Sequence, residues 1–148
     1  MENLSAPDVK EILTRYRTVA VVGASRDSSK DSYRVAEYLK NHGFHITPIN
    51  PSADEILGEK VYKSLVDMPE DVQKSLEVVD IFRPSNEVLP IVEQVVQLKK
   101  LHGTPYVVWM QLGIANEQAA EIARKAGLTV VMNKCMMQEH KKLIATEK

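Results

Sequence analysis

The feature of this sequence that most restricts its fold is a series of short apolar runs, each ended by a glycine, a proline or a polar loop. β-Branched residues are frequent in these runs, and apolar and polar residues do not strictly alternate. Such runs are typical of parallel strands that are buried on both faces. They predict strands over residues 18–22 (TVAVV), 45–50 (HITPIN), 76–82 (LEVVDIF), 106–110 (YVVWM) and 128–132 (LTVVM).

Helical patterns separate these runs. We expect helices that begin at Ser5, Ser32 and Asn116, whose side chains can accept hydrogen bonds from the open N–H groups of a first turn, and further helices over 88–101 and 136–144. We also expect a short strand at 61–65 and a helical turn at 69–74. Alternating strands and helices are typical of an α/β fold, and right-handed crossovers make this a Rossmann-like, doubly wound, mainly parallel sheet flanked by helices.

Composition limits the organisation and the partners of the chain. The 148 residues fit a single domain, and we expect its core to span about 18–143. A net charge of −1 gives no bulk field that would attract nucleic acid or an anionic membrane. The single cysteine excludes an intrachain disulfide, and the N-terminal residues lack the apolar stretch of a signal peptide. We therefore expect a cytoplasmic protein.

The turn Gly23-Ala24-Ser25 is the first candidate site. In doubly wound sheets, ligands bind beyond the carboxyl ends of the strands, and this turn follows the first strand of the expected sheet. Gly23 permits a sharp turn and a close approach by a ligand. Backbone N–H groups and the next helix N-terminus would face a phosphate, and Arg26 and Lys30 could neutralise its charge. An ordinary strand-to-helix loop with exposed serines is the alternative.

The sequence around this turn does not favour a nicotinamide cofactor. A G-x-G-x-x-G fingerprint would require glycines at positions 25 and 28, and both are serine. The second expected strand ends in Ile49-Asn50-Pro51, without the acid that usually binds the ribose of NAD. Another adenosine nucleotide remains compatible with the turn.

Several segments together resemble the small CoA-binding proteins whose domain also forms the N-terminal part of the succinyl-CoA synthetase α subunit. The resemblance runs from about 18 to 143, and its segments occur in the family's order and spacing. They are VVGAS with Lys30 and Tyr33 downstream, GFHITPINP at 43–51, DIFRPSNEV at 80–88, VWMQLGI at 108–114 and AGLTVVMNKCM at 126–136.

The resemblance implies coenzyme A, free or acylated, as the ligand. It implies that Gly23, Ala24 and Ser25 carry the pyrophosphate, and that Lys30, with Arg26, pairs with phosphate oxygens, including the 3′-phosphate. It also implies contacts from three further groups. They are Asn50 and Pro51 at the adenosine half, Phe82, Arg83 and Pro84 along the crevice, and Gln111 and Gly113 beside the pantetheine.

Some of these residues have equally simple structural interpretations. Arg83 could contact phosphate or pair with Asp80 or Glu87. Gln111 could face the ligand or make a structural hydrogen bond. Trp109 could serve as a stacking platform, but it is expected in the core, because its neighbours in the strand are apolar.

The leading hypothesis is a stand-alone CoA-binding module without chemistry of its own, monomeric or weakly self-associating. The 148 residues leave no room for the further domains of the synthetase. One alternative is an enzyme, either a partner-dependent acyl-CoA ligase component or a small NAD(P)-dependent enzyme. Another is a redox-sensing protein in which Cys135 exchanges with the CoA thiol, against the simpler interpretation of a buried, inert cysteine. Histidine and cysteine spacing predicts no metal site.

Overall fold

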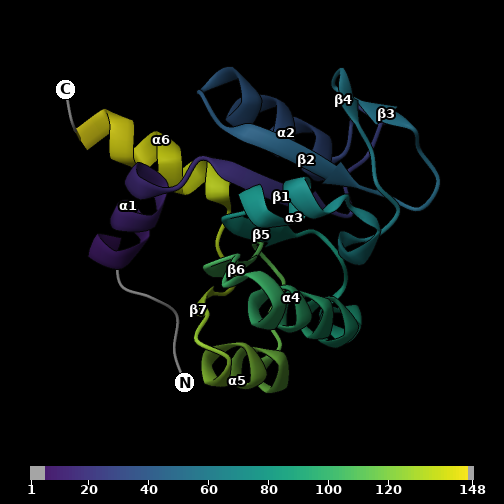
Figure 1. Cartoon of the computed structure of the whole chain (residues 1–148). Helices are drawn as coiled ribbons and strands as arrows, with labels where there is room; N and C mark the ends of the chain where they lie inside the picture. The colour runs from purple at the N-terminus through teal and green to yellow at the C-terminus, as the bar shows by residue number, and fades with distance from the viewer. Residues whose placement is uncertain (1–5, 147–148) are drawn as a thin grey trace.

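The computed structural model describes residues 6–146 and places five strands in one parallel sheet (Figure 1). Their order across the sheet is β2-β1-β5-β6-β7. The strands are β1 (Thr18–Val22), β2 (His45–Ile49), β5 (Val78–Ile81), β6 (Val107–Met110) and β7 (Thr129–Val131). All four neighbouring pairs are parallel, so the Rossmann-like α/β fold expected from the apolar runs is confirmed.

Helices cover both faces of this sheet (Figure 1). One face carries α1 (Ala6–Arg15), α2 (Asp31–Asn41) and α6 (Met136–Thr146), and the other carries α3 (Glu70–Ser75), α4 (Val88–His102) and α5 (Glu117–Lys125). Two short 3₁₀ turns, Leu65–Asp67 and Ser85–Glu87, lead into α3 and α4. The sheet is therefore the middle layer of three.

Two hydrophobic clusters, one on each face, hold the layers together. In β1, Val19 and Val21 pack toward α2 and α6, whereas Ala20 and Val22 pack toward α4. The alternation follows from the twofold repeat of a strand, and both sets are apolar because both faces are covered. Each fully buried valine contributes about 1.5–3 kcal/mol relative to an exposed one. This double burial explains why the runs in the sequence are apolar throughout.

The strand order places a crevice between β1 and β5. The chain leaves β1 toward α2 on one face, and it leaves β5 toward α4 on the opposite face. The two loops therefore diverge above the carboxyl ends of adjacent strands, which is where open α/β sheets bind ligands. The Gly23 turn borders this crevice.

The start of α2 differs from the prediction. Ser32 does not cap the helix, because the helix begins at Asp31 and Lys30 occupies the cap position with an extended backbone. Ser32 lies in the first turn and is buried. A carboxylate at Asp31 suits the positive end of the helix dipole, which favours this earlier start. Ser5 lies outside the described residues, whereas the predicted cap Asn116 is confirmed and accepts a hydrogen bond from Ala119 N at 2.9 Å.

The strand predicted at 61–65 was wrong. A two-stranded hairpin, β3 (Glu55–Ile56) and β4 (Glu59–Lys60), precedes this segment, and Leu57 and Gly58 form its turn at positive φ. Tyr62 makes a single parallel bridge to Ile49 at the edge of β2. Leucine is not a usual turn residue, so the hairpin had no strong signal in the sequence. The helical turn predicted at 69–74 corresponds to α3.

Candidate functional site

Gly23 brings the loop after β1 against the loop after β5. Its φ is +88°, in the left-handed region that favours glycine. A Cβ atom at this position would lie 2.9 Å from the carbonyl oxygen of Phe82 and 3.0 Å from Cδ of Arg83. The glycine is therefore required by the protein's own packing at the crevice.

The first N–H groups of the turn are used within the sheet. Those of Gly23 and Ala24 both donate to the carbonyl oxygen of Ile49, at 3.0 and 3.3 Å. Those of Ser25 and Arg26 have no acceptor within residues 6–146. Two adjacent donors beyond Ala24 are thus available to an anion, together with the open N-terminus of α2.

The loop between the turn and α2 is ordered by its own polar groups. Asp27 Oδ1 accepts hydrogen bonds from Ser29 Oγ at 2.7 Å and from Ser29 N at 2.9 Å, and these bonds lower the pKa of the Asp27 carboxyl. Arg34 donates to the carbonyl oxygen of Ser29 at 2.6 Å and pairs with Asp31. The position of Lys30 therefore follows from a hydrogen-bonded loop.

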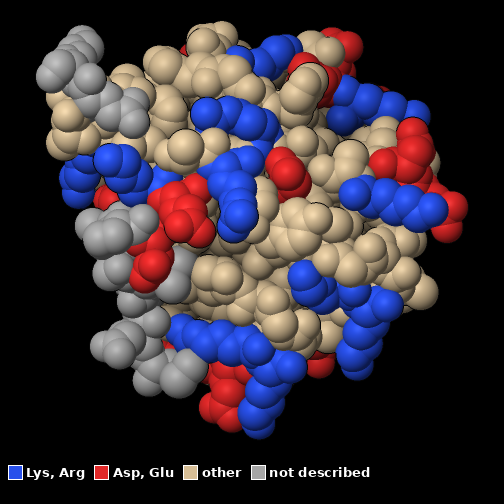
Figure 2. All heavy atoms as spheres, turned by 60° about the vertical axis from the view of Figure 1, so that its left-hand side comes forward, with Lys and Arg blue, Asp and Glu red and all other residues tan. Residues whose placement is uncertain are grey.

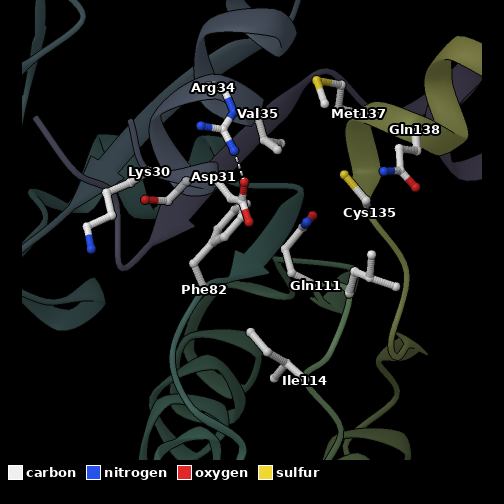
Figure 3. A pocket seen from close by; sticks show the side chains of 12 residues that line it. Lys30, Asp31, Arg34, Val35, Phe82, Gln111, Ile114, Cys135, Met137 and Gln138 are labelled. Carbon is white, nitrogen blue, oxygen red and sulfur yellow. Dashed lines mark hydrogen bonds and ion pairs between the residues drawn. The ribbon is translucent and has the colours of Figure 1, made fainter. Parts of the chain in front are cut away.

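A cavity of about 510 Å³ lies on the α2 and α6 side of the turn, and we call it the α2-side cavity. Its lining combines apolar side chains with Gln111 and the Cys135 thiol, and Lys30 lies at its edge beside the start of α2 (Figure 3). The residues that line it are Lys30, Asp31, Ser32, Arg34, Val35, Phe82, Gln111, Leu112, Ile114, Cys135, Met137 and Gln138.

A second cavity of about 500 Å³ lies on the other side of the turn, and we call it the α4-side cavity. The end of β2, the segment after β4 and the first part of α4 enclose it. Its lining consists of Val22, Gly23, Ala24, Ile49, Asn50, Pro51, Lys63, Ser64, Leu65, Arg83, Asn86, Glu87, Pro90, Ile91 and Gln94. Gly23 and Ala24 line the α4-side cavity only, whereas the α2-side cavity includes Phe82, whose carbonyl oxygen Gly23 closely approaches.

The predicted site residues divide between these cavities. Lys30, Phe82, Gln111 and Cys135 line the α2-side cavity, whereas Gly23, Ala24, Asn50, Pro51 and Arg83 line the α4-side cavity. Ser25, Arg26, Pro84 and Gly113 line neither.

Gln111 and Trp109 fix the segment that enters α6. Gln111 is buried, and its Oε1 accepts a hydrogen bond from Met136 N at 3.0 Å. Trp109 is fully buried in the core, as predicted, and its Nε1 donates to the carbonyl oxygen of Lys134 at 2.8 Å. Cys135 lies between these two attachment points, and 6% of it is exposed. The thiol is therefore held at the cavity wall by rigid neighbours.

Arg83 adopts one of its two predicted structural pairings. Its Nη2 lies 2.6 Å from Glu87 Oε1, and both side chains are nearly half exposed. Such an exposed pair contributes about 0–1 kcal/mol, so a phosphate could compete for the guanidinium at little cost. Asn50 is held more firmly, because its Nδ2 donates to the carbonyl oxygen of Ala24 at 2.7 Å.

Asp80 is the unexpected polar group near the site. It lies on β5 between Val21 and Trp109, it is fully buried, and neither carboxyl oxygen has a hydrogen-bond partner within the described residues. Burial raises the pKa of this carboxyl well above its usual range, because a charge is unfavourable in an apolar core. Asp80 is therefore a structural feature of the core and no pair for Arg83.

The outer surface shows mixed charge. Basic and acidic side chains are interspersed on the face shown in Figure 2. No cluster of three or more histidine, cysteine or acidic residues suitable for a metal occurs in residues 6–146. Nor does any helix in this range have the length and apolar character needed to span a membrane.

The missed site residues lie mainly in the segments whose structure was predicted poorly. Lys63 and Ser64 reach the α4-side cavity from the segment after the hairpin, which was predicted as a strand. The expected fold was the one signal that could have revealed Lys63 and Ser64, because the segment that contains them follows the connection from the carboxyl end of β2.

Known proteins share both the sequence and the fold of this chain. The protein YneT of Bacillus subtilis, which is uncharacterized, is 33% identical over 95% of this chain and 97% of its own length. An ADP-forming acetate–CoA ligase of Methanocaldococcus jannaschii is 31% identical over 88% of this chain, which spans only 19% of the ligase. The crystal structure of Prb, a PH1109 protein redesigned for binding, superposes with a TM-score of 0.86 at 38% identity, over 97% of this chain and 95% of Prb.

The family match covers nearly the whole described chain. The model of the CoA binding domain matches residues 17–141, which include all five strands of the parallel sheet and both cavities. The related ligase carries the corresponding region as a small part of a longer protein. The chain therefore belongs to the CoA binding domain family.

Proposed function

We propose that this protein binds coenzyme A or an acyl-CoA across the Gly23 turn, without chemistry of its own. The observation that carries the proposal is a pair of cavities at the crevice, one lined by Gly23 and Ala24 and the other by Lys30 and Phe82. The N–H groups of Ser25 and Arg26, in the loop between Ala24 and Lys30, have no acceptor within residues 6–146. Coenzyme A has an adenosine half and a pantetheine half joined by a pyrophosphate. One ligand of this form can occupy both cavities with its anionic centre at the turn.

The pyrophosphate is assigned to the donors beyond Ala24. The N–H groups of Ser25 and Arg26 and the N-terminus of α2 are suited to bind it, with Lys30 or Arg26 supplying the countercharge. In this proposal Gly23 and Ala24 shape the turn, since their N–H groups are bound to Ile49.

The adenosine half is assigned to the α4-side cavity. Asn50 and Pro51 would border it at the end of β2, and Arg83 would border it from the β5 side. The neutral side chain at Asn50 favours a nucleotide whose ribose carries a phosphate over one with a free diol, which an acid would bind.

The pantetheine half is assigned to the α2-side cavity. Phe82, Leu112 and Ile114 supply apolar contact, and Gln111 and Gly113 lie at the end of β6 and just beyond it. The thiol end, free or acylated, would come to lie near Cys135.

Binding without catalysis is supported by the polar side chains near the cavities, which are bonded to other groups of the protein or buried in the core. Gln111 holds Met136, Arg83 pairs with Glu87, and the Asp80 carboxyl is sealed in the core. Acetyl-CoA incubated with the protein should therefore remain intact, as judged by chromatography against a protein-free control. Protein-dependent loss of the thioester would contradict this part of the proposal.

Calorimetric titration tests the binding itself. We expect saturable 1:1 binding of CoA with a Kd below about 1 mM, and weaker binding of NAD and ATP. Lys30→Gln should weaken CoA binding, and Lys100→Gln, on the exposed end of α4, is the matched control and should not. No saturable heat with CoA, or stronger binding of NAD, would overturn the proposal.

A further inference from the structure

The two cations that line the α4-side cavity differ in whether they are already paired with an acid. Arg83 and Lys63 both line it, but Arg83 is already paired with Glu87. The side chain of Lys63 is exposed and makes no ion pair with any residue of the described chain. Glu87 is the only acid among the lining residues, and Arg83 offsets its charge. A net positive charge therefore remains on the Lys63 side.

The backbone holds Lys63 beside the end of β2. Asn50 N donates to the carbonyl oxygen of Tyr62 at 3.0 Å, and Tyr62 N donates to the carbonyl oxygen of Pro48 at 3.2 Å. Leu65, two residues after Lys63, is buried under α4 and anchors the segment from its other side. The lysine thus starts from a fixed backbone next to Asn50, and only its side chain needs to be ordered by a ligand.

The end of β2 is the position at which Rossmann-like sheets distinguish ribose substituents. An acid there binds a free diol, whereas a basic residue nearby accommodates a ribose phosphate. This chain has neutral Asn50 at the strand end and unpaired Lys63 beside it. Lys30, the cation expected from the sequence to bind the 3′-phosphate, lines the opposite cavity.

We infer that Lys63 binds the ribose 3′-phosphate of the cofactor and so sets its preference for CoA over dephospho-CoA. Lys30 is left for the pyrophosphate. The inference rests on the proposed function, because it assigns the adenosine half to the α4-side cavity.

Calorimetry with CoA and dephospho-CoA tests this assignment. Lys63→Gln should lower the affinity for CoA about tenfold and leave that for dephospho-CoA unchanged, because only CoA carries the phosphate that the lysine contacts. Lys30→Gln should weaken both ligands by the same factor. Lys63→Arg should retain the preference, since the charge is kept.

Lys60→Gln is the matched control, because Lys60 is an exposed lysine three residues earlier that does not line the cavity. It should keep the CoA preference of the wild type. If wild-type protein binds CoA but Lys63→Gln weakens both ligands equally, or neither, the assignment of Lys63 is wrong and the proposed function stands. If wild-type protein does not bind CoA, the proposed function itself is overturned.

Discussion

The two cavities have similar volumes but differ in how their polar groups are used. In the α2-side cavity, Gln111 is bonded to Met136 and Arg34 is paired with Asp31, and the remaining cation, Lys30, lies at the edge of the cavity beside the start of α2. In the α4-side cavity, Lys63 is unpaired and Arg83 is held only by an exposed ion pair. Under the proposed function, the α2-side cavity would hold the neutral pantetheine chain and the α4-side cavity the charged ribose phosphate.

The close contact at Gly23 joins a residue of the α4-side cavity to Phe82 of the α2-side cavity, and breaking it should give the largest effect. We expect Gly23→Ala to destabilise the fold by about 3 kcal/mol, because the added Cβ combines a strained positive φ with a collision against the Phe82 carbonyl. Gly43 also has a positive φ but has no atom within 4 Å of a built Cβ, so Gly43→Ala should cost only about 1 kcal/mol. Urea denaturation measures both, and equal losses would show that the contact between the loops contributes nothing.

Asp80 lies on the sheet face that carries the α2-side cavity, and it should make stability depend on pH. Its folded-state pKa is raised above the ordinary 3.8, so folding favours the protonated form. This contribution to stability is complete below pH 3.8 and is lost as pH rises toward the folded-state pKa.

Asp80→Asn should remove this dependence, so the variant gains stability relative to wild type as pH rises above 4. Urea denaturation across pH 4 to 8 measures the difference, and Asp67→Asn, at an exposed position, serves as the control. A constant difference between Asp80→Asn and wild type over this range would contradict the raised pKa.

The separate roles of the cavities can be tested with halves of the ligand. Gln111→Met removes the acceptor of Met136 N, and we expect it to weaken CoA about fivefold, or roughly 1 kcal/mol, through the disturbed α2-side wall. Its affinity for adenosine 3′,5′-bisphosphate should not change. Lys63→Gln should lower the affinity for both CoA and adenosine 3′,5′-bisphosphate. If Gln111→Met weakens the bisphosphate as much as CoA, the division between the cavities is wrong.

Cys135 should give the smallest effect on affinity. Cys135→Ser replaces one small side chain by another of similar shape at a buried position, so CoA affinity under reducing conditions should stay within about twofold. The redox hypothesis concerns oxidised CoA instead. There the Cys135 thiolate would attack the CoA disulfide, form a protein–CoA disulfide and release one CoA thiol. Intact-protein mass spectrometry detects this adduct, and its absence would leave the cysteine as a packing residue.

The five strands of the sheet could be predicted from the sequence because continuous apolar runs are typical of strands that are buried on both faces. TVAVV and YVVWM are apolar throughout, as strands covered on both faces are. Asn116 indicated the start of a helix because its side chain can accept a hydrogen bond from the first turn. The strand predicted at 61–65 was wrong because only Tyr62 pairs with the edge of β2, through a single bridge to Ile49, before the chain enters the 3₁₀ turn at Leu65.

The sequence could identify many residues of the candidate site, but not how they are arranged in space. Residues after the strand ends could be named because parallel strands bring their carboxyl ends together. Their division between two cavities could not, since it follows from how the loops after β1 and β5 pack against each other in three dimensions. Nor could the sequence show that Gly23 and Ala24 N–H groups are bound to Ile49, or that Lys63 is held beside Asn50 by Tyr62.

Amide NMR titration tests most directly whether one ligand spans both cavities. We predict that CoA shifts the amide signals of Ser25 and Arg26 most strongly and shifts residues of both cavities at the same ligand concentration. Adenosine 3′,5′-bisphosphate should shift only the turn and the α4-side cavity. If CoA leaves Ser25 and Arg26 unshifted, or shifts one cavity alone, the proposed placement of the cofactor across the turn is contradicted.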